Sequence, residues 1–124
     1  MRILVAHNQY HYRGGEDTVV DAEVALLRRH GHEVEVYRRD NAELTRMSAP
    51  DAALSTLWSR RTVDDLARLV ERFAPDLVHA HNIFPLISPS LYVGARRHRL
   101  PVVQTLHNFR LVCPQAMLVR RGRS

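Results

Sequence analysis

Lysine is absent from this sequence of 124 residues, and all 18 of its basic residues are arginine. Enzymes that form a Schiff base need a lysine amine, and the common phosphate-binding loop needs a lysine as well. The chain alone therefore cannot carry out either kind of chemistry. The simplest origin of this bias is a genome that favours arginine codons.

Cysteine and long apolar segments are also scarce. The single cysteine, Cys113, cannot form a disulfide within the chain, and no cysteine or histidine pairs stand at zinc-finger spacing. No apolar run approaches the roughly 20 residues that span a bilayer. Residues 1–7 are too short and too soon polar to form a signal peptide. We therefore expect a cytoplasmic protein, either free or attached peripherally to the inner face of the membrane.

The length and composition fit one globular domain over residues 1–124. A chain of this size buries about two thirds of its surface on folding, and its content of 45% hydrophobic and 25% charged residues is ordinary. The formal charge of +5 favours anionic partners. Because the arginines form scattered pairs without interleaved aromatic residues, we expect them on solvated faces and at helix ends, and we expect no nucleic-acid partner.

The first part of the chain has the pattern of a strand, a helix and a second strand. The apolar run 2–6 predicts a strand that is buried on both faces. After a polar loop, apolar residues at helical spacing predict a helix that stops at Gly31. Residues 33–37 alternate between apolar and polar, which predicts a half-exposed strand or an edge strand.

The middle of the chain contains two expected helices. A loop is expected over 47–51 and a short helix over 52–58. Thr62 and Asp65 resemble a capping box, and they predict the start of an amphipathic helix that continues until Pro75.

The last part of the chain predicts two more strands, over 76–81 and 101–107. Between them, a helix is expected with Ser88 as its cap, Pro89 as its first residue and an end near His98. Strands that alternate with helices predict an α/β fold with a doubly wound, Rossmann-like parallel sheet. In such folds ligands bind beyond the carboxyl ends of the strands.

The dipeptide His-Asn occurs three times, at 7–8, 81–82 and 107–108, and each time a predicted strand ends there. If the first, third and fourth strands are neighbours, three imidazoles and three carboxamides converge on one crevice. Such groups donate hydrogen bonds to sugar hydroxyls and phosphate oxygens without carrying a fixed charge. The alternative is that each histidine only caps its strand or bonds a nearby carbonyl.

Two further features could bind ligands. His79 and His81 share one face of a predicted strand, as metal ligands do, but no carboxylate stands at a recognised ligand spacing from them. The sequence therefore favours a site without metal over a metal-dependent hydrolase. Gly14 and Gly15 precede the first helix, where backbone amides can approach an anion. The alternative for the glycines is a flexible turn, and Glu16 would compete with an anion for that helix end.

Two segments resemble a known family: PDLVHAHNIFPLISPS over 75–90 and PVVQTLHNFRLVCP over 101–114. Together with the glycine pair after the first strand, they resemble the N-terminal domain of the family-four retaining glycosyltransferases of the GT-B fold. The resemblance covers nearly the whole chain. It implies a Rossmann-like domain that mainly binds the acceptor and faces a second domain, which holds the sugar nucleotide.

The resemblance also implies roles for single residues. His107 matches the active-site histidine, which contacts the transferred sugar and the diphosphate. The glycine pair matches the loop that approaches the donor diphosphate and the acceptor. The candidate site is catalytic His107 with a substrate-binding set of Gly14, Gly15, Glu16, His81, Asn82, Asn108 and Arg110. The implied substrates are a sugar nucleotide and a glycan or lipid-linked acceptor, with no metal and no other cofactor.

The chain ends before the donor domain that the family carries. We therefore expect the incomplete N-terminal half of a GT-B glycosyltransferase, which is inactive alone and works with a second domain or a second chain. One alternative is a subunit of a split glycosyltransferase. Another is a binding module that kept the fold and lost catalysis.

Overall fold

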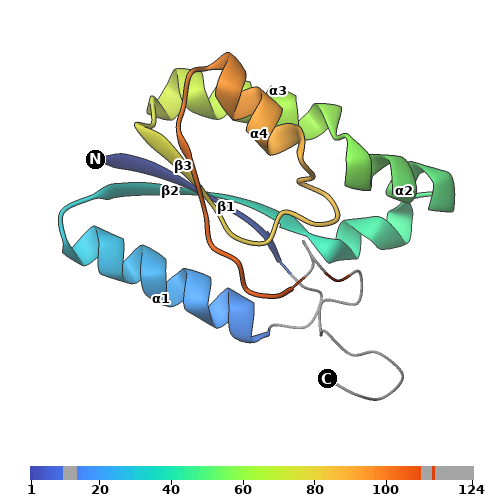
Figure 1. The fold of residues 1–124 in the computed structure, drawn as a ribbon, viewed down its shortest axis with the longest axis horizontal. Helices are drawn as coiled ribbons and strands as arrows, with labels where there is room; N and C mark the ends of the chain where they lie inside the picture. The colour runs from blue at the N-terminus through green and yellow to red at the C-terminus, as the bar shows by residue number, and fades with distance from the viewer. Residues whose placement is uncertain (10–13, 110–112, 114–124) are drawn as a thin grey trace.

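A computed structural model of the chain describes residues 1–9, 14–109 and 113 (Figure 1). These residues form a single sheet of four parallel strands in the order β2-β1-β3-β4. The strands are β1 (Arg2–Gln9), β2 (Glu33–Asp40), β3 (Leu77–Ala80) and β4 (Val102–Gln104). The predicted Rossmann-like α/β fold is confirmed. The first, third and fourth strands are neighbours, and β2 is the edge strand that the alternating pattern of 33–37 predicted.

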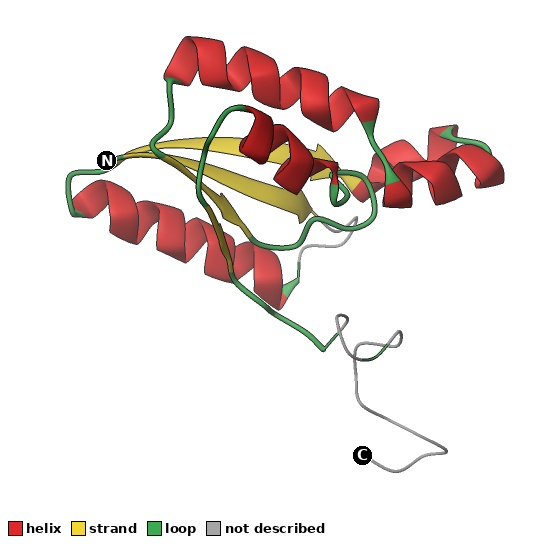
Figure 2. Ribbon diagram, turned by 45° about the horizontal axis from the view of Figure 1, so that its top comes forward, coloured by secondary structure: helices red, strands yellow, loops and turns green. Residues whose placement is uncertain are grey.

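Helices cover both faces of this sheet (Figure 2). On one face lies α1 (Gly15–Arg29), and on the other lie α3 (Arg60–Phe73) and α4 (Ser90–Arg97). A 3-10 helix, η1 (Asn41–Arg46), and α2 (Ala49–Leu57) follow the carboxyl end of β2. In the described part of the chain, no helix is long and apolar enough to cross a membrane.

The side chains of β1 alternate between two apolar cores, because successive residues of a strand point to opposite faces. Ile3 and Val5 pack with Val20 and Val24 of α1. Leu4 and Ala6 belong instead to the larger core under α3 and α4, which contains Leu4, Ala6, Tyr37, Leu66, Val78, Ala80, Ile83, Ile87, Leu91 and Ala95. The two cores explain why residues 3–6 are apolar without interruption.

The packing of α4 against α3 depends on a small residue. A Cβ atom added at Gly94 would lie 2.8 Å from Cδ2 of Leu66, which is closer than van der Waals contact allows. The glycine therefore lets the two helices approach closely over the sheet.

Several predicted boundaries are wrong by a few residues. The first strand continues to Gln9, so its His-Asn pair lies inside the strand, whereas β4 stops at Gln104 and leaves its pair beyond the strand. Part of the loop expected over 47–51 is helical, because α2 begins at Ala49. The hydroxyl of Ser59, and not that of Thr62, accepts the capping hydrogen bond at the start of α3. The helix α4 begins one residue after Pro89.

Candidate functional site

The candidate site lies at the carboxyl ends of β1 and β3. The chain passes from β1 outward to β2 and then returns to the other side of β1 to form β3. The strand order therefore reverses between β1 and β3, and open α/β sheets bind ligands beyond the carboxyl ends at such a point.

Four histidines gather at this point, and we call them the imidazole cluster: His7, His79, His81 and His107. The ring centroids of His79 and His81 are 4.4 Å apart, and those of His81 and His107 are 5.1 Å apart. The ring of His7 lies 6.3 Å from that of His81, edge to face. The predicted convergence of the three His-Asn imidazoles is confirmed, and His79 joins them from the same face of β3.

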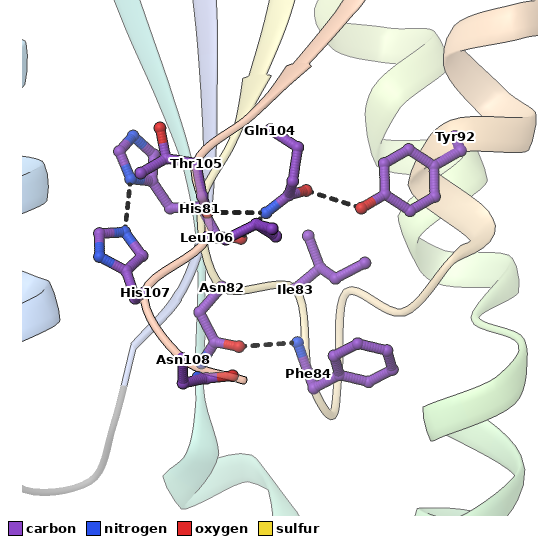
Figure 3. A pocket seen from close by; sticks show the side chains of 10 residues that line it. All are labelled: His81, Asn82, Ile83, Phe84, Tyr92, Gln104, Thr105, Leu106, His107 and Asn108. Atoms are coloured by element: carbon purple, nitrogen blue, oxygen red, sulfur yellow. Dashed lines mark hydrogen bonds between the residues drawn. The ribbon is translucent and has the colours of Figure 1, made fainter. Parts of the chain in front are cut away.

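The pair formed by His81 and His107 opens onto a pocket (Figure 3). Nδ1 of His81 and Nε2 of His107 are 2.9 Å apart, so one ring donates a hydrogen bond and the other accepts it. Asn82 and Asn108 line the same pocket. Four of the predicted site residues therefore share one pocket.

The opposite side of the pocket is fixed by Gln104 and Tyr92. The amide of Gln104 donates to the backbone carbonyl of His81 over 2.5 Å, and the Tyr92 hydroxyl donates to the Gln104 side-chain oxygen over 2.6 Å. Both contacts are drawn in Figure 3. They tie β4 and α4 to the residue that follows β3, and so they hold the pocket in shape.

A carboxylate of α1, that of Asp17, contacts the ring of His7. Its Nε2 lies 2.8 Å from Oδ1 of Asp17, and both side chains are buried. The other oxygen of Asp17 accepts a hydrogen bond of 2.8 Å from the backbone amide of Gly14. This chain of contacts connects the imidazole cluster to the glycine pair at the start of α1.

The glycine pair leaves open space at the start of α1. Among the described residues, no atom lies within 4 Å of a Cβ added at Gly15, and Oδ2 of Asp17 alone comes that close to one at Gly14. Packing of the described residues therefore gives no reason for either residue to be small. Glu16 accepts a hydrogen bond of 3.3 Å from the Asn108 amide, which brings the segment after β4 to this helix end.

The three asparagines do not converge as predicted. The side-chain oxygen of Asn8 accepts hydrogen bonds from the backbone amides of Leu86 and Ile87, on the side of the sheet away from α1. Asn8 faces that side because it follows His7 in a strand, where neighbours point to opposite faces. Its role is to fold the loop after β3. Of the remaining candidates, Arg110 lies outside the described residues.

Three buried polar atoms of this region have no hydrogen-bond partner: Nδ1 of His7, Oε2 of Glu16 and Nε2 of His81. Buried polar atoms are nearly always paired, and an unpaired one costs about 1–3 kcal/mol. The pKa of His81 is lowered to about 3, first by burial and then by the neighbouring imidazoles of His79, His107 and His7. His81 is therefore neutral at physiological pH, and its buried Nε2 can still form a hydrogen bond with a ligand.

Sequence reasoning missed one functional candidate, Glu23. Its carboxylate lies 3.1 Å from Nδ1 of His79 and 3.6 Å from Nε2 of His81. The available signal was its position on α1, because Glu23 adjoins the buried Val20 and Val24 and so lies beside the helix face that packs on the sheet.

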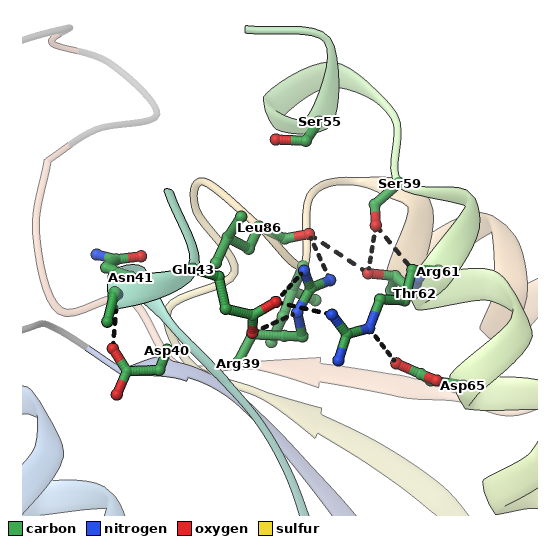
Figure 4. Close-up of polar contacts among 12 residues, drawn as sticks. Arg39, Asp40, Asn41, Glu43, Ser55, Ser59, Arg61, Thr62, Asp65 and Leu86 are labelled. Carbon is green, nitrogen blue, oxygen red and sulfur yellow. Dashed lines mark hydrogen bonds and ion pairs between the residues drawn. The ribbon is translucent and has the colours of Figure 1, made fainter. Parts of the chain in front are cut away.

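A second polar group lies beyond the carboxyl end of β2, and we call it the arginine cluster: Arg39, Glu43, Arg61 and Asp65 (Figure 4). Arg39 donates two hydrogen bonds, of 3.0 and 2.8 Å, to the carboxylate of Glu43 and a longer one to the carbonyl of Leu86. Arg39 is only 6% exposed. The expectation that the arginine pairs lie on solvated faces or at helix ends is therefore wrong for Arg39.

The charges of the arginine cluster stabilise one another. The hydrogen bond from Arg39 lowers the pKa of Glu43, while partial burial opposes the shift and the charges of Arg39 and Arg61 add to it. Burial alone would lower the pKa of Arg39, but its contacts with Glu43 outweigh that effect and raise it. Both groups therefore stay charged at neutral pH.

The fold and the site together define a class of protein: a Rossmann-like α/β domain with a polar pocket at the carboxyl edge of its sheet. The family model described as Glycosyltransferase Family 4 matches residues 13–122, and the chain belongs to this family. No curated protein and no solved structure matches the chain.

Proposed function

We propose that this chain forms the acceptor side of a retaining glycosyltransferase of the GT-B type, which transfers a sugar from a sugar nucleotide to a glycan or lipid-linked acceptor. The observation that carries the proposal is the gathering of unpaired polar atoms around one pocket in a member of this family. His81, whose buried Nε2 has no partner, lines the pocket, and the unpaired Nδ1 of His7 and Oε2 of Glu16 belong to residues that lie beside the lining residues His81 and Asn108.

In this proposal, His107 contacts the transferred sugar and the departing diphosphate. Transfer with retention passes through a positive sugar centre and releases an anionic diphosphate, so catalysis depends on electrostatic stabilisation. The half-buried imidazole of His107 and the backbone amides of the first turn of α1 are hydrogen-bond donors suited to that anion. Contact with His81 fixes the orientation of the His107 ring.

The acceptor is proposed to lie over the segment after β3. Asn82 and the rim formed by Tyr92 and Gln104 supply amide and hydroxyl groups, which suit sugar hydroxyls. The open space at Gly14 and Gly15 suits a ligand that approaches the backbone closely. Transfer itself is proposed to need a second Rossmann-like domain that holds the nucleotide, in the same protein or in a partner chain.

The binding part of the proposal is tested by titrating the ¹⁵N-labelled chain with inorganic pyrophosphate and recording NMR spectra. We expect concentration-dependent shifts of the His107 ring and of the Gly14 and Gly15 amides. The shifts of the Gly14 and Gly15 amides should disappear in His107→Ala, and all the shifts should persist in His98→Ala, which changes an exposed histidine at the end of α4. Absence of shifts in the unchanged chain, or their persistence in His107→Ala, would refute the assignment.

The catalytic part is tested with a radiolabelled sugar nucleotide and a lipid-linked or glycan acceptor. We expect no transfer by residues 1–124 alone and transfer when a chain that carries the donor domain is added. Turnover by the isolated chain would show that the second domain is not required. Pyrophosphate binding without transfer under either condition would favour the non-catalytic binding module.

We also propose that the protein is cytoplasmic and contacts an anionic membrane surface through α2. Leu54 and Leu57 are 64% and 73% exposed, and Trp58 is 44% exposed. Arg46, which ends η1, and Arg60 flank this apolar surface. Cosedimentation with vesicles that contain phosphatidylglycerol should fall in Leu57→Ser and at high salt. Equal binding to neutral vesicles would refute an electrostatic contribution.

A further inference from the structure

His79 of β3, His81 just after this strand and Glu23 of α1 present ligand atoms to one another on the face of the sheet that α1 covers. One ligand atom from each of these three residues lies within 4.8 Å of the other two. The alternation of β3 places both rings on this face, and the position of Glu23 beside the packed face of α1 brings the carboxylate to them.

The other nitrogen of each ring already has a partner. Nε2 of His79 lies 2.8 Å from the hydroxyl of Thr105, and Nδ1 of His81 lies 2.9 Å from Nε2 of His107. Metal-binding histidines usually have such a second contact, which orients the ring and leaves the opposite nitrogen free for the ion. In both rings, the nitrogen left over is the one directed at Glu23.

Hydrogen bonds among Glu23, His79 and His81 leave one ring nitrogen without a partner. The contact of 3.1 Å between His79 and Glu23 is a normal hydrogen bond, but Nε2 of His81 is 3.6 Å from the carboxylate and is buried without a partner. An ion between the three ligand atoms would satisfy that nitrogen. Four-coordinate zinc with bonds of about 2.0–2.2 Å requires ligand atoms about 3.3 Å apart. The separation of 3.1 Å between Nδ1 of His79 and Oε1 of Glu23 and that of 3.6 Å between Nε2 of His81 and Oε2 of Glu23 lie on either side of that value.

We propose that Glu23, His79 and His81 form a binding site for a divalent transition-metal ion, and that zinc is the ion that fits it best. Two imidazoles and one carboxylate are a ligand set that zinc accepts, with a fourth position open to water. Glu23 is only partly buried, which leaves a route for the ion from solvent. This site shares His81 with the pocket proposed for transfer, but the observations that support it do not depend on the transferase assignment.

Metal binding would also fix the proton positions in the neighbouring pair of rings. A metal bound to Nε2 of His81 leaves the proton of that ring on Nδ1, which then donates to Nε2 of His107. His107 would carry its own proton on Nδ1. The metal would therefore set the tautomer of the ring that we assign to catalysis.

The test uses the complete, tag-free chain, treated with a chelator and dialysed. Zn²⁺ alone is titrated in competition with a chromophoric chelator, and Co²⁺ is used as a spectroscopic probe of coordination. We expect one tight Zn²⁺ ion per chain, a four-coordinate Co²⁺ spectrum and a rise in Tm at saturating Zn²⁺. ¹⁵N shifts of the His107 ring should report the tautomer on Nδ1.

Variants identify the ligands. Glu23→Gln and, independently, His79→Gln should each weaken Zn²⁺ binding by roughly 100-fold and abolish the rise in Tm. Glu33→Gln removes an exposed carboxylate, and His98→Gln removes an exposed imidazole, so both controls should bind as the unchanged chain does. Circular dichroism confirms that the variants fold. The proposal is overturned if the unchanged chain binds no Zn²⁺, or if Glu23→Gln and His79→Gln bind it as tightly as the controls.

Discussion

The imidazole cluster and the arginine cluster lie beyond neighbouring strands of one sheet, yet they differ in how completely their polar atoms are paired. In the arginine cluster, Arg39 uses three donors on Glu43 and Leu86, and Arg61 adds a further contact to Glu43. In the imidazole cluster, one buried nitrogen of His7 and one of His81 have no partner. The charged groups of the arginine cluster pair with one another and with a backbone carbonyl, whereas two ring nitrogens of the imidazole cluster can still form hydrogen bonds with a ligand.

The two clusters therefore have different purposes. The arginine cluster reaches the carbonyl of Leu86, and Asn8 holds the amides of Leu86 and Ile87, so both support the loop that follows β3. That loop begins with the residues that line the pocket. Paired charges stabilise the scaffold, and the two unpaired imidazole nitrogens lie beside it.

The largest effect is expected from Arg39→Met. Removal of the buried partner of this ion pair should cost about 3 kcal/mol, because Glu43 keeps only the exposed Arg61 and the carbonyl of Leu86 loses a donor. The matched control is Arg38→Met in the adjacent position of β2, where the half-exposed pair with Asp21 contributes under about 1 kcal/mol. Urea denaturation measures both free energies of unfolding. Similar losses in the two variants would contradict the structural role of Arg39.

A smaller loss is expected from Asn8→Ala. The substitution leaves the buried amides of Leu86 and Ile87 without their acceptor, which costs about 2 kcal/mol. Asn108→Ala, at the third His-Asn pair, should cost no more than about 0.5 kcal/mol, because its contact to Glu16 is only partly buried. Equal losses would mean that the asparagines are equivalent, as the sequence suggested.

The arginine cluster should also make the free energy of unfolding depend on pH, through Glu43. Because the pKa of Glu43 is lower in the folded state than its ordinary value of 4.5, its contribution is complete above pH 4.5. That contribution is lost as the pH falls through the folded-state pKa. Glu43→Gln should therefore flatten the decline of unfolding free energy below pH 4.5. Parallel curves for the variant and the unchanged chain would show that Glu43 contributes nothing there.

The smallest effect on stability is expected from His107→Ala. The side chain lies on the segment after β4 and is half-buried, and water that replaces the ring can bond Nδ1 of His81, so its removal should change the free energy of unfolding by about 0.5 kcal/mol or less. The same variant should lose the response to pyrophosphate. A large loss of stability would place His107 with the structural residues instead.

Much of the fold could be predicted from local patterns. The run 2–6, the stripe of α3 and the alternation of 33–37 each report burial on particular faces, and burial follows from the position of an element in the sheet. Segment ends were less accurate, because they depend on tertiary contacts. His7 and Asn8 extend β1 since β2 continues beside them to Asp40, and their sequence does not show this pairing.

The site residues could be predicted where a sequence motif recurs at the ends of strands. They could not be predicted where the contact depends on how two elements pack together. His81 and His107 were found because each follows an apolar strand. Glu23 was missed because its partners lie more than 50 residues away, and the contact depends on how α1 packs on the sheet. Arg39 was misplaced for a related reason: its burial depends on η1, which supplies Glu43.

The alternation of β1 has a consequence for how the chain tolerates insertions and deletions. Loss of one residue from the first half of β1 would turn every later side chain of the strand to the opposite face. The carboxamide of Asn8 would then meet Asp17, Gln9 would take the place beside the amides of Leu86 and Ile87, and the imidazole of His7 would point into the apolar core under α3 and α4. The number of residues in this strand therefore decides which layer receives the His7 ring and which receives the group that folds the loop.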